Sequence, residues 1–126
     1  MKLLWIGVGG ALGSVARYLL ATGLQRVAPA GFVLGTFAVN VLGSFVMGFV
    51  VALTLARGTF DTDGRVVVTA GVLGGFTTYS SFNQEALELL EARAFGALAL
   101  HVGATVVVCL LAGWLGALAG RRLAAG

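Results

Sequence analysis

Four long apolar segments follow one another along the chain, separated by short polar stretches. Each segment supplies the roughly 20 apolar residues that a helix needs to cross about 30 Å of hydrocarbon. The pattern therefore predicts four transmembrane helices, at residues 3–24, 32–56, 66–90 and 95–120. The connections between them are too short to hold a soluble domain, so we expect residues 1–126 to form one transmembrane domain in a lipid bilayer.

The composition supports an integral membrane protein. Of the 126 residues, 59% are hydrophobic and 10% are charged, which is well outside the range of ordinary soluble domains. With one histidine, one cysteine and no convergent acid–base set, the chain offers little chemistry for an enzyme. Cys109 has no partner for an intrachain disulfide, and we expect it to act as a small buried hydrophobe.

Basic residues divide only weakly between the two predicted sides of the membrane. Those on one side are Lys2, Arg57, Arg65, Arg121 and Arg122, and those on the other are Arg26, Arg93 and Arg17. Orientation in the membrane follows the Lys and Arg content near the helix ends. So small a difference is compatible with insertion in both orientations.

The first apolar segment resembles two unrelated elements, and neither is expected here. Lys2, the apolar run and the SVA triplet at residues 14–16 resemble a signal peptide, but we expect the segment to remain as a helix. The stretch IGVGGALG at residues 6–13 looks like a dinucleotide-binding turn. That turn requires a glycine where Leu12 stands, and no acidic residue precedes Asp61 to hold a ribose. We expect neither a nucleotide nor a nucleic acid as a partner.

Small residues recur at the four-residue spacing that brings membrane helices into close contact. The pairs are Gly9/Gly13, Gly31/Gly35, Ser44/Gly48, Gly71/Gly75 and Gly116/Gly120. We expect most of them to be helix contacts. So many contacts on so small a protein also suggest an oligomer.

Polar residues inside the apolar segments carry the functional information, because they are costly at membrane depth and usually face the protein interior or a water-filled path. Thr36, Asn40 and Ser44 fall on one helical face of the second segment. Hydrogen bonding between helices explains Thr36 and Ser44 as well as a pathway does, whereas the amide of Asn40 favours a functional role. Arg17 lies deep in the first segment, where it either reaches toward the interface or lines an aqueous vestibule that attracts anions.

The stretch GGFTTYSSF at residues 74–82 predicts a broken helix in the third segment. Glycine destabilises helix interiors, and hydroxyl side chains can bond the backbone groups that a break releases. The first half-helix would end near Gly74 and expose carbonyls that suit a cation. The second would begin near Thr78, and its face would carry Ser81 and Glu85.

Three motifs, GGALGSVARY at residues 9–18, GTFAVNVLGSFVMG at 35–48 and GVLGGFTTYSSF at 71–82, together resemble the Fluc/CrcB fluoride-channel family. The resemblance covers nearly the whole chain. It implies a passive, fluoride-selective channel in the cell inner (plasma) membrane, built as a homodimer of antiparallel subunits with two pores. It also implies a structural sodium ion at the centre of the dimer interface.

The resemblance assigns roles to individual residues of this sequence. The sodium would be held by the backbone carbonyls of Gly74 and Thr77 from each subunit. The anion pathway would include the amide of Asn40, the aromatic pair of Tyr79 and Phe82, the hydroxyls of Ser80 and Ser81, and the charge of Arg17.

The sequence departs from the family pattern in two places. Tyr79 stands where the family has a phenylalanine, so a hydroxyl enters the aromatic pair. The family's fourth-segment hydroxyl track is reduced here to His101 and Thr105. Of these we place Thr105 in the pathway, with hydrogen bonding between helices as the alternative.

Two other functions compete with a channel. Small multidrug-resistance exporters are also four-helix membrane dimers, but they need an acidic residue in the membrane and the first segment has none; Glu85 and Glu88 would have to supply it. In a membrane scaffold without transport, the polar residues would serve only to hold helices together.

Overall fold

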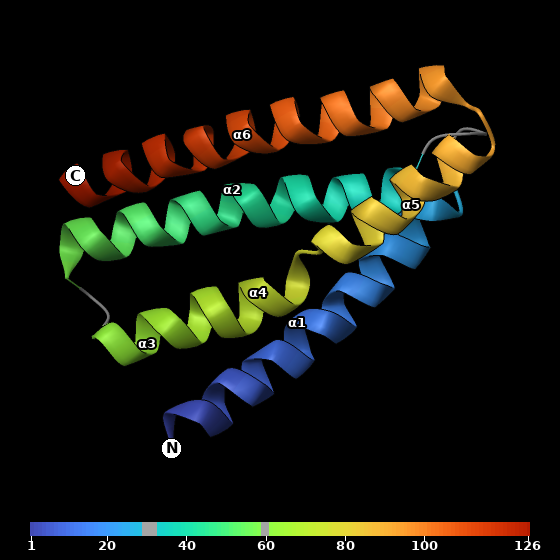
Figure 1. Ribbon diagram of the computed structural model, residues 1–126. Coiled ribbons are helices and arrows are strands. Elements are labelled where there is room, and N and C mark those ends of the chain that lie inside the picture. Colours follow the sequence, from blue (N-terminus) through green and yellow to red (C-terminus); the bar gives the residue numbers. More distant parts are fainter. Residues whose placement is uncertain (29–32, 59–60) are drawn as a thin grey trace.

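The computed structural model describes residues 1–28, 33–58 and 61–126, and all regular structure in these ranges is helical (Figure 1). The elements are α1 (Lys2–Gln25), α2 (Leu34–Arg57), α3 (Thr62–Val66), the π-helix η1 (Val67–Leu73), α4 (Gly74–Phe76), α5 (Tyr79–Glu91) and α6 (Phe95–Ala125). Within the described ranges, α1, α2 and α6 are long and apolar enough to cross a membrane. The structure thus confirms an all-helical fold with membrane-spanning helices.

Local capping explains where the observed helix ends differ from the predicted ones. The third segment begins at Thr62 rather than 66, because the side chain of Asp61 accepts a hydrogen bond from the Gly64 N–H at 2.7 Å and caps the helix. Gly58, with φ of 61°, ends α2 in the left-handed conformation. The last helix continues to Ala125, past the predicted end at 120. The predicted start of the second helix, at residue 32, lies outside the described residues.

The third segment is broken, as predicted, but the break falls after the double glycine. α3, η1 and α4 run on without interruption, and the chain then becomes extended at Thr77 (ψ 157°) and Thr78 (φ −148°) before α5 begins. Gly75 stays helical because it lies against α1, where an added Cβ would overlap the backbone carbonyl of Gly10. The glycines therefore serve packing, and the two threonines form the break.

Glycine contacts hold the helices together in two layers. α2 lies along α6, while α1 packs against η1, α4 and α2 (Figure 1). A Cβ at Gly116 would overlap the Phe45 carbonyl of α2, and one at Gly13 would overlap the Val72 carbonyl of η1. The predicted helix contacts are confirmed, apart from Gly31, which is outside the described residues. They are made within one chain, so they do not by themselves call for an oligomer.

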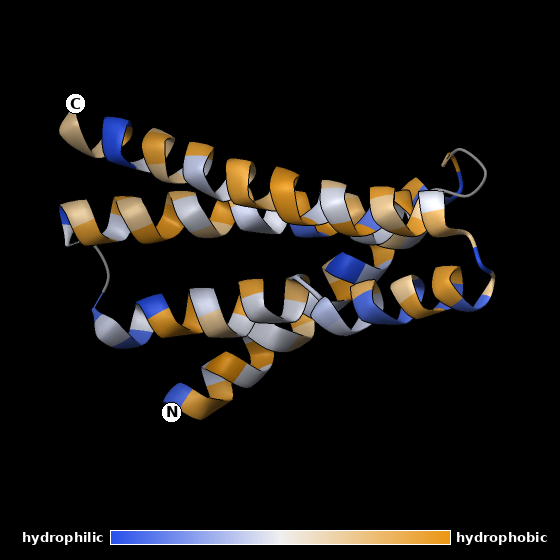
Figure 2. Ribbon diagram, turned by 45° about the horizontal axis from the view of Figure 1, so that its top comes forward, coloured by the Kyte–Doolittle hydropathy of each residue, from blue (hydrophilic) through white to orange (hydrophobic). Residues whose placement is uncertain are grey.

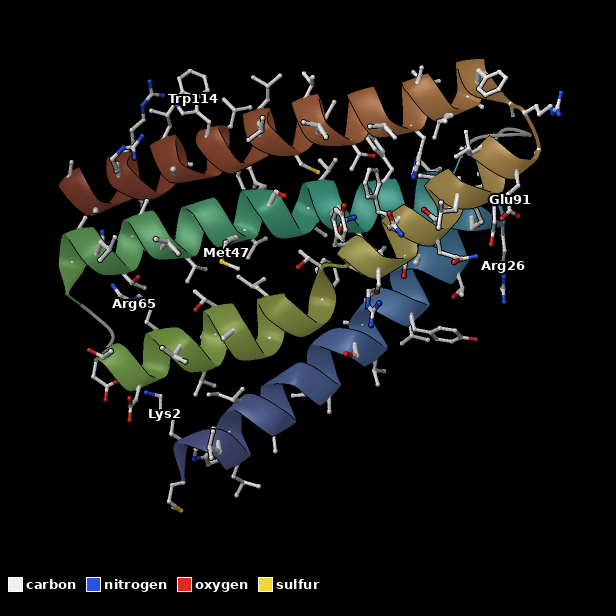
Figure 3. The ribbon with its side chains drawn as sticks, viewed as in Figure 1. Lys2, Arg26, Met47, Arg65, Glu91 and Trp114 are labelled. Atoms are coloured by element: carbon white, nitrogen blue, oxygen red, sulfur yellow. The ribbon has the colours of Figure 1, made fainter. Side chains whose placement is uncertain are left out.

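The outward faces of the long helices are hydrophobic, and hydrophilic positions gather at the helix ends and along α5 (Figure 2). Trp114, for example, is 59% exposed and points away from α2 (Figure 3). Both termini lie at one end of the molecule, together with Lys2 and Arg65, while Arg26 and Glu91 lie at the other (Figures 1 and 3). Lys2 and Arg65 thus lie at the opposite end of the helix bundle from Arg26 (Figure 3).

Candidate functional site

Asn40 holds the break in the third segment from the side. Its Nδ2 donates to the Thr78 carbonyl at 3.0 Å, and its Oδ1 accepts from the Thr78 N–H at 2.8 Å. Both backbone groups of a residue that is 8% exposed are thus paired by one amide. Asn40 has a second Nδ2 hydrogen, so one donor is left for another partner.

The break also changes the pairing of carbonyls in α4. In a continuous helix the Thr78 N–H would bond the carbonyl of Gly74, but here it bonds Asn40. The Thr77 N–H and hydroxyl both donate to the Leu73 carbonyl, each at 3.0 Å. Gly74 is exposed, and the N–H that would bond its carbonyl in a continuous helix is paired elsewhere. A released carbonyl suits a hard cation.

A hydroxyl cluster caps the second half-helix. Thr78 is the N-cap of α5, and its Oγ1 accepts from the Ser81 N–H at 3.2 Å. The same oxygen donates to the Ser81 hydroxyl at 3.1 Å and lies 3.2 Å from the Ser80 hydroxyl. The sequence placed the start of the second half-helix near Thr78, as observed, but did not assign Thr78 the role of its cap, although a threonine three residues before Ser81 has the spacing of a helix cap.

An open groove of about 520 Å³ runs beside the break. Its lining combines polar residues from three elements with apolar ones, namely Asn40, Ser44, Met47, Thr77, Thr78, Tyr79, Phe82, Thr105, Val106, Cys109 and Leu110. Met47 points from α2 toward the third segment (Figure 3). Cys109 is half-buried in this lining rather than fully buried as expected. The groove gathers four of the predicted pathway residues: Asn40, Tyr79, Phe82 and Thr105.

The aromatic pair forms one wall of this groove. The ring centroids of Tyr79 and Phe82 lie 5.7 Å apart and their planes are tilted by 49°, within the range of favourable aromatic pairs. Tyr79 is 77% exposed. The pair is therefore complete within one chain, but its outer ring is uncovered.

Arg17 and Ser81 line a second, smaller cavity on the other side of the break. This cavity measures about 200 Å³ and is bordered by Arg17, Tyr18, Ala21, Thr22, Thr36, Val39, Thr78 and Ser81. The Nε of Arg17 is buried and makes no hydrogen bond to the described part of the chain. The structure thus divides the predicted pathway residues between a groove and a cavity, and Thr78 borders both. Ser80 is exposed and borders neither space, but its hydroxyl contacts that of Thr78.

The polar residues of α2 contact the third segment at two points, at Asn40 and at Thr36. Besides Asn40 at the break, Thr36 donates to Oε1 of Glu85 in α5. The other carboxylate oxygen lies 3.5 Å from Nε2 of His101 in α6. His101 in turn stacks on Phe82 with ring centroids 5.0 Å apart. Sequence reasoning left Glu85 and His101 without a role, because only the fold brings α5 and α6 together.

These features define a multi-pass membrane protein whose polar site is built around an interrupted helix. A family model described as CrcB-like protein, Camphor Resistance (CrcB), matches residues 4–117. The chain belongs to this CrcB family, which confirms the resemblance seen in its motifs.

Relatives cover nearly the whole chain. A protein from Sorangium cellulosum is 47% identical over 122 residues, which are 97% of this chain and 96% of the relative. One from Geobacter sulfurreducens is 44% identical over 121 residues (96% and 98%), and one from Nitratidesulfovibrio vulgaris is 46% identical over 120 residues (95% and 97%). All three relatives are named fluoride-specific ion channel FluC. The family is one of ion channels and not of enzymes.

Proposed function

We propose that this chain is a fluoride-selective channel that lets fluoride leave the cell passively across the plasma membrane. The observation that carries the proposal is the groove at the break, where a half-buried amide, hydroxyls and two aromatic rings meet in an otherwise apolar protein. The names of relatives that match over nearly the full length support fluoride as the ion.

The chemistry of the groove suits a small, strongly hydrated anion. Amide and hydroxyl donors can replace its water, and ring edges add weak favourable contacts without a full charge. Several weak sites in a row allow an ion to enter and also to leave. Arg17 adds a positive charge in the neighbouring cavity, where it can attract the anion without holding it at the groove.

The functional unit that we propose is an antiparallel homodimer with two pores. One chain leaves the groove open and the ring of Tyr79 exposed, and a second copy would cover both. In each chain the third segment would make the fourth membrane crossing, as two half-helices on either side of Thr77 and Thr78. The five-to-three division of basic residues between the two ends is weak enough to allow both orientations.

We propose further that a structural sodium ion binds between the two copies. The carbonyls of Gly74 and Thr77 would hold it, because the break releases backbone oxygens and Gly74 lies on an exposed face. One chain offers too few of these oxygens for a hard cation, so a matching pair from the partner would complete the set. Bound sodium would stabilise the dimer and neutralise the negative C-terminal end of α4 in each of the two chains.

A proton-coupled exporter of the small multidrug-resistance type is the runner-up. Glu85 is the carboxylate that could serve it, since it lies inside the bundle against Thr36 and His101. The names of the relatives favour the channel. Proton-dependent drug efflux that is lost in Glu85→Gln would reverse this preference.

The test is fluoride efflux from liposomes that contain the purified protein, with chloride efflux as the control for selectivity. We expect fluoride to leave and chloride to stay. Asn40→Asp replaces a donor by a negative charge, which at about 4 Å costs an anion about 4 kcal/mol at an intermediate dielectric constant, so flux should fall at least tenfold. Phe82→Ile removes an aromatic ring from the groove and should also lower fluoride flux strongly.

Phe95→Ile is the matched control, because Phe95 is 62% exposed and borders neither the groove nor the Arg17 cavity. It should conduct like the wild type. Equal fluoride and chloride flux in the wild type would refute selectivity. Full fluoride flux in both groove variants would show that fluoride does not pass through the groove.

A further inference from the structure

A carboxylate and an imidazole face each other in the protein wall between the groove and the Arg17 cavity. Oε2 of Glu85 and Nε2 of His101 are 3.5 Å apart. Thr36, which bonds the other oxygen of Glu85, borders the cavity, and Phe82, which stacks on His101, borders the groove. A charge on this pair therefore lies close to both spaces.

The facing atoms of the pair lack other partners. His101 is 1% exposed, and in the described part of the chain neither of its ring nitrogens makes a hydrogen bond. Oε2 of Glu85 is likewise buried without one. Buried polar atoms are normally hydrogen-bonded, because desolvation without a partner is costly. The single N–H of a neutral imidazole, when it is on Nε2, points at Oε2 and gives both atoms a partner. The other ring nitrogen and the carboxylate are then the two places where a further proton can bind.

The charged and titratable groups around the pair come from α5 and α1. α5 contributes Glu88, one turn beyond Glu85, whose negative charge repels that of Glu85. α1 contributes Arg17 and Tyr18, which border the cavity across from Thr36. α2 faces the pair with the neutral Thr36, and α6 with His101 itself. Without an added proton, the Glu85–His101 pair carries one negative charge.

We propose that Glu85 and His101 form a proton-binding site that controls the charge beside the anion pathway. The inference rests on the proposed fluoride conduction. A proton taken up from water bonds to the ring nitrogen of His101 that carries none, or to the carboxylate, and either product makes the pair neutral. Neutralisation removes a repulsive charge from the path of an anion, so fluoride flux rises as the pH falls.

The experiment measures fluoride efflux from liposomes at equal internal and external pH, from about pH 8 to about pH 5.5, a range that brackets the ordinary titration of an imidazole. Protein-free liposomes at each pH give the leak of hydrogen fluoride to subtract. Wild-type flux should rise at least about threefold on acidification, the effect of removing a nearby unit charge in a medium of intermediate dielectric constant. Because the chain has a single histidine, nitrogen NMR of its labelled ring reports on His101 alone.

Three variants separate the site from its surroundings. Glu85→Gln keeps the shape and removes the charge, so its flux should be high and independent of pH. His101→Gln removes the imidazole, so its flux should stay low where the wild type rises. Glu88→Gln is the control on the same helix and should keep a rise in flux on acidification, because it leaves both members of the pair in place. Gel filtration checks that each variant is assembled as the wild type is.

The outcomes separate this inference from the proposed function. Active wild-type protein with flux that does not change with pH would overturn the proton site and leave the channel standing, and so would a rise that persists in both Glu85→Gln and His101→Gln. Absence of fluoride flux at every pH would refute the proposed function. In that case the ring signals still decide the proton site, which is refuted if they do not change over this range or change identically in Glu85→Gln.

Discussion

Replacing Asn40 with alanine tests whether one side chain holds the broken helix in place. The substitution removes the bond to the Thr78 carbonyl at 3.0 Å and the bond from the Thr78 N–H at 2.8 Å. Thr78 is 8% exposed, so its N–H would be left buried and unpaired. Its carbonyl would lose one of two partners, because Thr78 is the N-cap of α5 and its carbonyl also accepts the first hydrogen bond of that helix.

The cost follows from these two bonds. Leaving a buried polar group without its partner costs about 1–3 kcal/mol, while hydrogen bonds between membrane helices average about 0.6 kcal/mol. For one unpaired N–H and one weakened carbonyl we expect a loss of about 2 kcal/mol in the free energy of unfolding, or about a 30-fold change in the equilibrium constant. Unfolding in mixed detergent micelles with increasing dodecyl sulfate, followed by circular dichroism, measures the loss.

Ser44→Ala is the matched control, since Ser44 lies one turn further along α2 in the same groove and its side chain makes no hydrogen bond within the described residues. It should change the free energy of unfolding by less than about 0.5 kcal/mol. Hydrogen exchange at the Thr78 amide should be at least about tenfold faster in Asn40→Ala, because a loss of 1.4 kcal/mol already gives that factor. If Asn40→Ala unfolds like Ser44→Ala and the Thr78 amide stays protected, the break does not depend on this amide.

Two further substitutions probe the packing and the cap of the third segment in the same unfolding assay. In Gly13→Ala the new Cβ would overlap the Val72 carbonyl, so we expect the free energy of unfolding to fall by about 1–3 kcal/mol from overpacking. Gly7 has open space around it, so Gly7→Ala should cost far less. Equal stability of the two variants would contradict the contact between Gly13 and Val72. Thr78→Ala removes the oxygen that accepts from the Ser81 N–H and should lower the free energy of unfolding by about 1 kcal/mol. Thr78→Ser keeps that oxygen and should retain most of this stability. A serine variant as unstable as the alanine variant would show that the hydroxyl is not the cap.

Much of the architecture could be predicted from the sequence because the bilayer imposes simple rules on it. Apolar segments of the right length must be helices, since backbone groups find no water in the hydrocarbon. The ends of α1 and α2 fall within a residue or two of the prediction where they are described. The glycine spacing likewise predicted close helix contacts, because only small residues let backbones approach.

The break illustrates where local reasoning stops. GGFTTYSSF indicated an interrupted helix, but the glycines suggested it should begin near Gly74. Gly75 stays helical in contact with Gly10 of α1. Asn40, from another helix, stabilises the extended conformation of Thr78 because it hydrogen-bonds both of that residue's backbone groups. The exact position of the break was therefore decided by two neighbours distant in sequence.

The sequence by itself determined that this protein spans a membrane, that its third segment is interrupted and that its polar residues are few, because these features depend on hydropathy and on local backbone preference. Only the tertiary structure decided that Asn40 clamps the break, that Arg17 and Phe82 border different spaces and that Glu85 meets His101. Those pairings depend on how α1, α2, α5 and α6 cross. Helix crossing is set by side-chain packing between segments far apart in the chain, which no local pattern records.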